Sequence, residues 1–306
     1  MLKEEMRLKT FLALTLLFSL PQSFADAGRA FGSAGTWVYS LPQEFQQRIL
    51  WYADHEEGNL YDWEYDDPDM SGGGIFNTGS PEEAFAEAVS SVAFSGTYSV
   101  QATIKNAFRS MNGNKAVRLM RWTDKPWDMG GKNFPKAAYY STWMMIPENY
   151  NPTKEAPWDP GDGGWWNVFQ FKSKDKKGES QPLWVLNIGR DEASGQMKPY
   201  LYTKYNKPHS YDLAADPLPV GQWFHIEAYF KQSGRRKRNG AIAFWLNGTK
   251  IFKARRVVTR LHGAAIIWGI GNYTDHIDGG AAPGSATVYF DDAIVSTAPV
   301  HRYVAR

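Results

Sequence analysis

The feature of this sequence that most constrains its fold is the alternation of apolar and polar residues along many short segments. Gly, Pro, Asn and Asp separate these segments, and a period of two is typical of β-strands with one buried face. The segments cover residues 98–104, 117–123, 138–146, 166–172, 183–188, 200–205, 223–231, 241–246, 266–273 and 287–295. Since helical segments do not alternate with them, the pattern predicts an antiparallel sandwich or jelly roll rather than a βαβ fold.

Turn and cap signals add local detail. Asn247-Gly248 lies between two strand-like segments and predicts a type I′ hairpin, because both residues tolerate a positive φ. Residues 81–89 follow a serine that can act as N-cap and carry two acids in the first turn, so we expect a helix there. A second short helix is expected within 42–50.

Composition excludes several classes of protein. The 306 residues include 34 Lys and Arg against 32 Asp and Glu, so overall basicity does not favour nucleic-acid binding. The apolar fraction of 43% excludes a disordered chain, and the absence of cysteine excludes disulfides and thiolate chemistry. Aromatic residues reach 15%, more than one core requires, and sugar-binding surfaces are built from aromatic faces.

The N-terminus reads as an export signal. Residues 10–20 form an apolar run that is too short to span a bilayer, Arg7 and Lys9 precede it, and a small-residue cleavage site ends at Ala25. An N-terminal membrane anchor is the alternative. We therefore expect a secreted or periplasmic protein without membrane contact after cleavage. The expected divisions are a signal peptide (1–25), an N-terminal segment (26–44) and one domain (45–306).

Three passages resemble a known family. Residues 55–63 (HEEGNLYDW) resemble the E-x-G-x-x-x-x-W opening of secreted jelly-roll polysaccharide lyases. Residues 221–227 and 244–248 resemble their paired central strands, and 271–273 with 288–292 resemble their closing strands. Together the passages are similar to the heparin lyase I and glucuronan lyase group, and more distantly to jelly-roll alginate lyases.

The resemblance implies a concanavalin-like β-jelly roll, in which two antiparallel sheets stack and the concave one forms a sugar groove. It also implies a polysaccharide lyase that cleaves an acidic, uronate-containing polysaccharide by β-elimination. A non-catalytic carbohydrate-binding jelly roll of the cell envelope or secretome is the alternative, because W-x-H and W-L-N-G also occur in lectin-like modules. The sequence lacks the paired carboxylates of a jelly-roll glycoside hydrolase and the Gly-x-Ser-x-Gly of a serine hydrolase.

β-Elimination requires three groups. One neutralises the C5 carboxylate, a base removes the C5 proton, and an acid protonates the leaving O4. Related lyases use Gln, Asn or Arg for the first task and His, Lys or Tyr for the others. Alternation places Gln170 and Lys172 on one strand face with Trp166, and Lys172 stands where the family's Gln-x-His pattern has its histidine.

Strand faces supply the other candidates, since Tyr200, Tyr202 and Lys204 share one face, as do Trp223, His225, Glu227 and Tyr229. Of Arg118 and Arg121, only one can reach a groove, because residues three apart point to opposite faces. The expected catalytic residues are Gln170, Lys172, Arg121, Tyr202, Lys204 and His225. The expected substrate-binding residues are Trp166, Tyr200, Trp223, Glu227, Tyr229 and Tyr273. The alternatives are solvated strand residues for Gln170 and Lys172, a structural histidine for His225, and sugar-stacking platforms for the tyrosines.

Partners and cofactors follow from charge and from the resemblance. No cofactor is expected for the chemistry, but the resemblance implies a structural Ca²⁺ that joins Glu57 to Asp291 or Asp292, with ordinary surface acids as the alternative. Residues 235–238 are all basic and more bases follow the hairpin, which suits an anionic polysaccharide, or else a solvated loop. We expect an acidic polysaccharide as partner, no nucleic acid, and a monomer.

Overall fold

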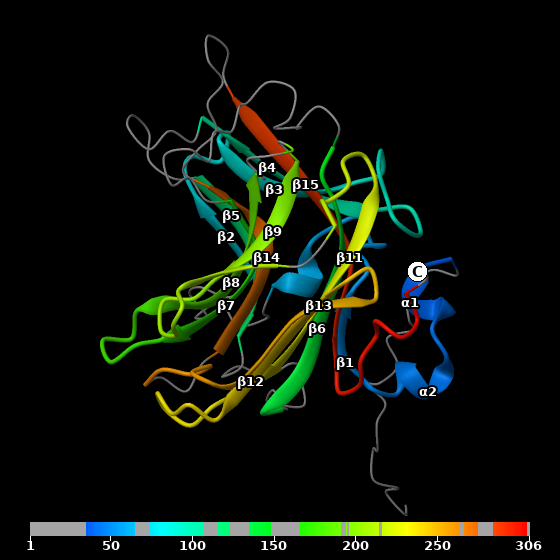
Figure 1. The fold of residues 1–306 in the computed structure, drawn as a ribbon. Helices are drawn as coiled ribbons and strands as arrows, with labels where there is room; N and C mark the ends of the chain where they lie inside the picture. Colours follow the sequence, from blue (N-terminus) through cyan, green and yellow to red (C-terminus); the bar gives the residue numbers. More distant parts are fainter. Residues whose placement is uncertain are drawn as a thin grey trace, which may run out of the picture. The chain divides into compact units, whose positions relative to one another are not determined.

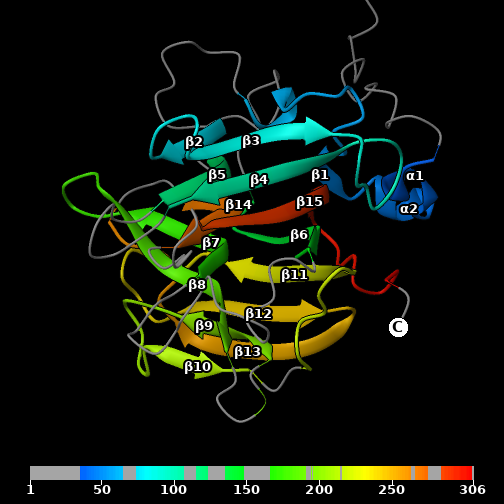
Figure 2. The ribbon, with the colours of Figure 1, turned by 90° about the horizontal axis from the view of Figure 1, so that it is seen from above.

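The computed structural model describes residues 35–64, 74–106, 115–122, 135–147, 166–190, 194, 196–213, 216–262, 266–274 and 284–304. Within them, two antiparallel sheets stack face to face (Figures 1 and 2), and the predicted all-β jelly-roll class is confirmed. The predicted signal peptide and the Pro/Gly/Asp-rich segment 151–164 lie outside the described residues. No helix among the described residues is long and apolar enough to cross a membrane.

Sheet A, the first sheet, follows the order β13-β12-β11-β6-β15-β4-β3, with β1 paired to β15. Figure 2 shows this order across the stack. Its strands are β13 (Thr249–Val257), β12 (Gly240–Leu246), β11 (Trp223–Lys231), β6 (Ala137–Met145), β15 (Ser285–Ser296), β4 (Ser99–Lys105), β3 (Ala84–Val89) and β1 (Ile49–Ala53).

Sheet B, the second sheet, follows the order β10-β9-β8-β7-β14-β5-β2. Its strands are β10 (Ser210–Asp212), β9 (Met197–Tyr202), β8 (Ser180–Arg190), β7 (Trp166–Lys174), β14 (Ile266–Thr274), β5 (Lys115–Trp122) and β2 (Gly74–Thr78). The ten strands that alternation predicted all appear, each within a few residues of its expected bounds.

Helices are few and short. The described ones are α1 (Trp37–Ser40), α2 (Gln43–Gln46) and the 3₁₀ turn η2 (Tyr61–Trp63). The helix expected over 81–89 is wrong: a turn leads into β3, which pairs antiparallel with β4. Ala84, Ala86 and Ala88 pack on the core from β3, so this segment also carries a period of two that small residues made inconspicuous. The helix expected within 42–50 shrinks to α2, and β1 begins at Ile49.

The predicted hairpin joins β12 to β13. Asn247 and Gly248 have φ values of 46° and 76°, the left-handed conformation that a type I′ turn requires. The side-chain Oδ1 of Asn247 also accepts a hydrogen bond from the backbone N–H of His225, at 2.8 Å. The turn is therefore tied to the neighbouring strand β11 as well as to its own hairpin.

Aromatic side chains fill the space between the sheets. Phe171 of sheet B stacks on Phe230 of sheet A with ring centroids 4.2 Å apart, and Phe169 meets Phe244 edge to face at 5.9 Å. Each fully buried phenylalanine contributes about 1.5–3 kcal/mol through removal of apolar area from water. The apolar face predicted for β11 is confirmed, since Phe224, Ile226, Ala228 and Phe230 all belong to this core. Consequently the alternate residues of each strand point outward.

Candidate active site on the outer face of sheet B

The central strand of sheet B presents two of the predicted residues on its outer face. Phe169 and Phe171 point into the core, so Gln170 and Lys172 point the other way. Gln170 is only 3% exposed, and its Nε2 has no hydrogen-bond partner among the described residues. Lys172 is half-buried. This pair of polar side chains is the start of the candidate site.

Lys172 is unusually ready to lose its proton. Burial and, to a smaller extent, the positive charge of Arg118 together lower the pKa of its ammonium from 10.5 to about 8. Both effects disfavour the charged form. A lysine with this pKa is partly neutral just above neutral pH, so it can act as a base.

Arg118 is the arginine that shares this face. It is 6% exposed, and its guanidinium lies over the rings of Phe76 and Tyr273, with its Cζ 4.7 and 4.4 Å from their centroids. Its Nη2 donates to Thr78 Oγ1 at 3.4 Å. Tyr273, a predicted substrate-binding residue, thus lies on the candidate face.

Arg121, the arginine we selected from the sequence, lies on the opposite side of β5. Its Nη1 donates to the carbonyl of Asp62 at 3.4 Å and to that of Glu64 at 3.3 Å, and its guanidinium lies over Trp51. Its partner across the ladder is the core residue Trp268. The two arginines do point to opposite faces, as their spacing required, but Arg118 replaces Arg121 in the candidate site.

A bulge changes the expected faces at the start of β7. The pairing of β7 with β8 shifts between Asn167 and Phe169. Trp166, a predicted sugar platform, therefore turns into the core, where its Nε1 donates to Asn272 Oδ1 at 2.8 Å. Asn167 takes the outer face instead, and its Nδ2 donates to Asn187 Oδ1 at 3.4 Å.

The tyrosines of β9 lie in line with outward-facing residues of β7 and β8 across the sheet. Tyr200 is the ladder partner of Asn187, and Tyr202 is the partner of Val185, which in turn pairs with Gln170. Gln170 and Tyr202 therefore occupy one row, two strand spacings or roughly 10 Å apart. Lys204 follows β9, is exposed, and donates from Nζ to Gln181 Oε1 at 3.0 Å.

This geometry can be compared with known proteins. A family model described as "Polysaccharide lyase" matches residues 56–293. The chain belongs to the polysaccharide lyase family. The family predicted from the sequence motifs is confirmed.

Several solved structures are similar to this chain. An endo-β-1,4-glucuronan lyase from the fungus Trichoderma reesei matches with a TM-score of 0.56 and 17% identity, over 82% of this chain and 96% of that one. An alginate lyase from Aplysia kurodai gives 0.46 and 10% over 82% and 99% of the two chains. One from a Chlorella virus gives 0.42 and 17% over 69% and 89%. A search of curated proteins found no match. The glucuronan lyase likeness supports the shared fold.

The other predicted residues of this polysaccharide lyase lie on sheet A, away from Lys172. His225 is fully buried on β11, with its ring 5.5 Å from that of Trp37 and 5.2 Å from that of Trp143. Burial and, to a smaller extent, the charge of His301 together lower the pKa of His225 to about 3. Neither ring nitrogen of His225 has a hydrogen-bond partner among the described residues, so the ring is held by its aromatic neighbours.

The neighbours of His225 on the same face also serve other contacts. Glu227 is fully buried and accepts hydrogen bonds from the backbone N–H groups of Val300 and His301, at 2.9 and 2.7 Å. Trp223 packs edge-on to Phe94 at 6.0 Å, and Tyr229 lies 5.0 Å from Tyr139. These predicted substrate-binding residues share the expected face, but it belongs to sheet A and so does not adjoin Lys172.

The predicted calcium ligands do not gather. Glu57 is exposed, whereas both Asp291 and Asp292 are fully buried. Asp291 Oδ2 accepts from the N–H of Phe94 at 2.9 Å, and Asp292 Oδ2 accepts from Ser95 Oγ at 2.6 Å. Within the described residues, no three His, Asp or Glu side chains are placed to hold a metal ion. The calcium site therefore stays a prediction.

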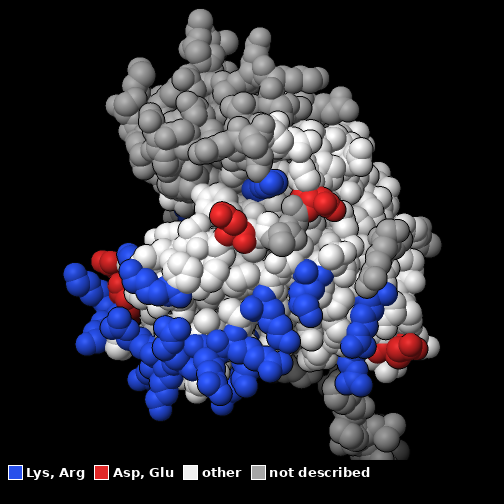
Figure 3. Space-filling model, viewed as in Figure 1, with Lys and Arg blue, Asp and Glu red and all other residues white. Residues whose placement is uncertain are grey.

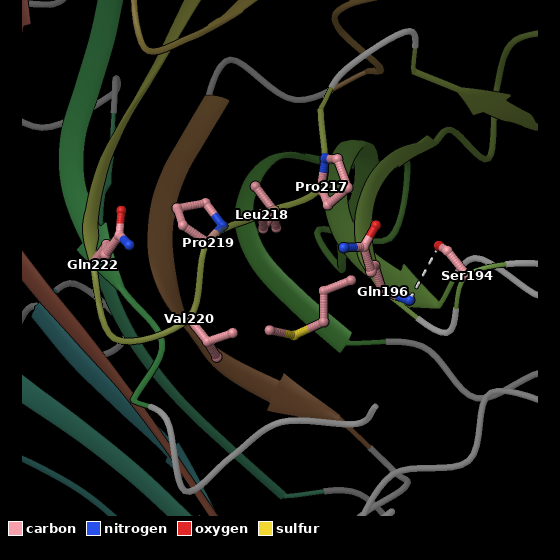
Figure 4. A pocket seen from close by; sticks show the side chains of 8 residues that line it. Ser194, Gln196, Pro217, Leu218, Pro219, Val220 and Gln222 are labelled. Atoms are coloured by element: carbon pink, nitrogen blue, oxygen red, sulfur yellow. Dashed lines mark hydrogen bonds between the residues drawn. The ribbon is translucent and has the colours of Figure 1, made fainter. Parts of the chain in front are cut away.

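One pocket lies near the end of β9. It has a volume of about 620 Å³, and Figure 4 shows Pro217, Leu218, Pro219 and Val220 along it. Gln196 and Gln222 supply its amides, and Ser194 Oγ accepts from the N–H of Gln196 at 3.3 Å. None of the described residues that line the pocket is titratable, so the candidate site remains the outer face of sheet B.

Proposed function

We propose that this polysaccharide lyase cleaves a uronate-containing polysaccharide by β-elimination on the outer face of sheet B. The observation that carries the proposal is Lys172, whose pKa falls to about 8 through burial and the charge of Arg118, on the face that also holds Gln170. A face that holds both a cation and a basic amine suits a substrate with carboxylates.

Arg118 and Gln170 are the groups that would neutralise the C5 carboxylate. The guanidinium of Arg118 is nearly buried, so its charge is poorly screened by solvent. Gln170 Nε2 is a buried donor without a partner among the described residues, and such donors are costly unless a ligand pairs with them. Together they would stabilise the carboxylate as negative charge develops at C5.

Lys172 would be the base. Its neutral amine removes the C5 proton, the C5–H electron pair becomes the C4=C5 double bond, and the C4–O4 bond breaks. The proton stays on Lys172 until solvent removes it. Because the charged lysine cannot accept a proton, the rate depends on the fraction of Lys172 that is neutral.

Tyr202 would be the acid that protonates the departing O4. It shares a row with Gln170 and is half-buried, and the intervening Val185 leaves roughly 10 Å between the two backbones. A sugar ring bound over Val185 would meet the amide on one side and the phenol on the other. Tyr200, beside Asn187, would hold a neighbouring sugar.

The test is the ultraviolet absorbance of the unsaturated uronate that only elimination produces. The mature protein is mixed with glucuronan, alginate, heparin, pectate and hyaluronan, with and without Ca²⁺. A rise on one polymer supports the proposal and names the sugar. Binding to a polymer without any rise would instead favour a non-catalytic carbohydrate-binding protein.

Export to the periplasm or medium and a monomeric state remain part of this proposal. Residues 10–20 support export through their length and apolar character. Fractionation of cells that express the full chain, followed by mass measurement of the exported protein, tests cleavage after Ala25 and the oligomeric state together.

A further inference from the structure

We propose that the outer face of sheet A carries a second binding strip for an acidic polysaccharide, separate from the site on sheet B. We call it the basic strip. Its residues are Lys231, Lys253, Arg255, Tyr229, Ala241 and Ala243. The chemical class of the ligand rests on the proposed function, but the strip itself rests on charge and register.

The charge distribution of the chain singles out this region. Residues 228–274 contain ten Lys and Arg and no Asp or Glu, while 24 Lys and Arg face all 32 acids in the rest of the chain. Lys231, Lys253, Arg255 and the residues 235–238 are all exposed. Figure 3 shows Lys and Arg gathered over β12 and β13. A face of one charge sign attracts a polymer of the opposite sign.

The pairing of β11, β12 and β13 arranges these basic side chains in rows. Ala241 pairs with Arg255 on one side and with Lys231 on the other. Ala243 pairs in the same way with Lys253 and Tyr229. Paired residues point to the same face, so two alanines form a low floor between a basic row on β13 and a mixed row on β11. The rows are two strand spacings, roughly 10 Å, apart.

Half-buried aromatic rings border the floor, Tyr229 on β11 and Trp245 at its end on β12. Tyr229 lies 5.0 Å from Tyr139, and Trp245 stacks on His301 with centroids 4.3 Å apart. Trp245 is itself the ladder partner of Lys250. Flat rings beside cations fit a chain of carboxylated sugar rings, whose faces are apolar and whose edges are anionic.

The strip also extends at one end. Beyond Lys231 and Arg255, the loop 235–238 is held against the segment that follows β13 by a hydrogen bond from Arg236 N to the carbonyl of Arg260, at 2.9 Å. A polymer lying on the alanine floor would therefore continue onto four more cations. A short fragment would not reach them, so the strip should favour long chains.

The experiment measures binding of long and short alginate and glucuronan chains, at two salt concentrations, to Lys172→Ala protein that cannot consume them. A charge-reversed pair, Lys253→Glu with Arg255→Glu, is compared with the matched pair Arg48→Glu with Lys207→Glu, which are exposed bases on other elements. The strip pair should weaken binding of long chains about tenfold and flatten its salt dependence. The matched pair should change affinity by less than about twofold.

A variant that leaves the charge unchanged tests whether the sugar rings contact the strip or whether charge attraction alone accounts for binding. Tyr229→Leu keeps the charge and should also weaken binding of long chains. Equal losses in the two charge-reversed pairs, or no loss in the strip pair, would overturn the strip. Tighter binding of single-stranded DNA or of phosphatidylglycerol vesicles, lost in the same variants, would overturn the sugar assignment. Strip-dependent binding, combined with no eliminative cleavage of any polymer by the protein that retains Lys172, would contradict the proposed function and leave the strip intact.

Discussion

The two outer faces of the sandwich both hold buried polar side chains, but Glu227 on sheet A and Gln170 on sheet B differ in their hydrogen-bond partners. On sheet A, Glu227 receives backbone N–H groups and the ring of His301 from the C-terminal segment. On sheet B, Gln170 Nε2 has no partner among the described residues, and Lys172 lies near the like charge of Arg118. Buried polar groups in folded proteins are normally paired. The comparison indicates that Glu227 serves the fold of sheet A, whereas Gln170 and Lys172 on sheet B are available to a ligand.

The largest loss of activity is expected when Lys172 of sheet B is removed. Lys172→Ala should reduce kcat by about 10³-fold, because a positioned base contributes about 10²–10⁴-fold. Elimination on the active polymer is the measurement, and unchanged thermal unfolding shows that the fold is retained. Lys174→Ala is the matched control, since Lys174 shares the strand and its Nζ lies over Trp122. Comparable losses in both variants would move the base elsewhere.

The two arginines of β5 test the same comparison within one strand. In the wild type, kcat/KM should rise with pH through about 8, because Lys172 must be neutral to act. Arg118→Gln should lower activity about 10²-fold and move this rise to higher pH, because the repulsive charge is gone. The midpoint should stay below 10.5, since burial is the larger cause of the shift.

Arg121→Gln is the counterpart to this variant. It should reduce thermal stability, because its guanidinium bonds the carbonyls of Asp62 and Glu64, and it should leave the pH midpoint in place. A shifted midpoint in Arg121→Gln, or an unshifted one in Arg118→Gln, would contradict the assignment of faces.

Alternation along the sequence was enough to predict the strands and, within most of them, the faces. Residues 223–231 illustrate both the power and the limit of that pattern. Phe224 and Ile226 do lie in the core and His225 does point outward, but nothing in the alternation indicates which of two stacked sheets the strand joins. Sheet membership depends on long-range pairing, so His225 was grouped with a site on the other sheet.

Local irregularities account for the remaining differences. The bulge after Asn167 reverses the expected faces of Trp166 and Asn167, and a bulge leaves no clear mark in a single sequence. The choice of Arg118 over Arg121 depends on the pairing of β5 with β14, where Gly271 lies opposite Arg118 and leaves room for the arginine side chain. The sequence shows the glycine but not this pairing.

The two tyrosines of β9 should affect different kinetic parameters. Tyr202→Phe should lower kcat about 10²-fold, because O4 loses its proton donor. Tyr200→Phe should mainly raise KM, since Tyr200 lies one row away, beside Asn187. Initial rates over a range of polymer concentrations separate the two parameters. A larger kcat loss in Tyr200→Phe would exchange the two roles.

His225 should affect stability alone, which completes the contrast between the sheets. Its folded pKa of about 3 lies below the ordinary 6.5, so unfolding takes up a proton between these values. The stabilisation is therefore present above pH 6.5 and is lost as pH falls towards 3, by on the order of a few kcal/mol. Denaturant unfolding at pH 7 and pH 4 measures this loss. His225→Phe should reduce it, the exposed His209→Phe should not, and neither should alter elimination at pH 8. If acid sensitivity persisted unchanged in His225→Phe, the loss would have to arise from another buried group.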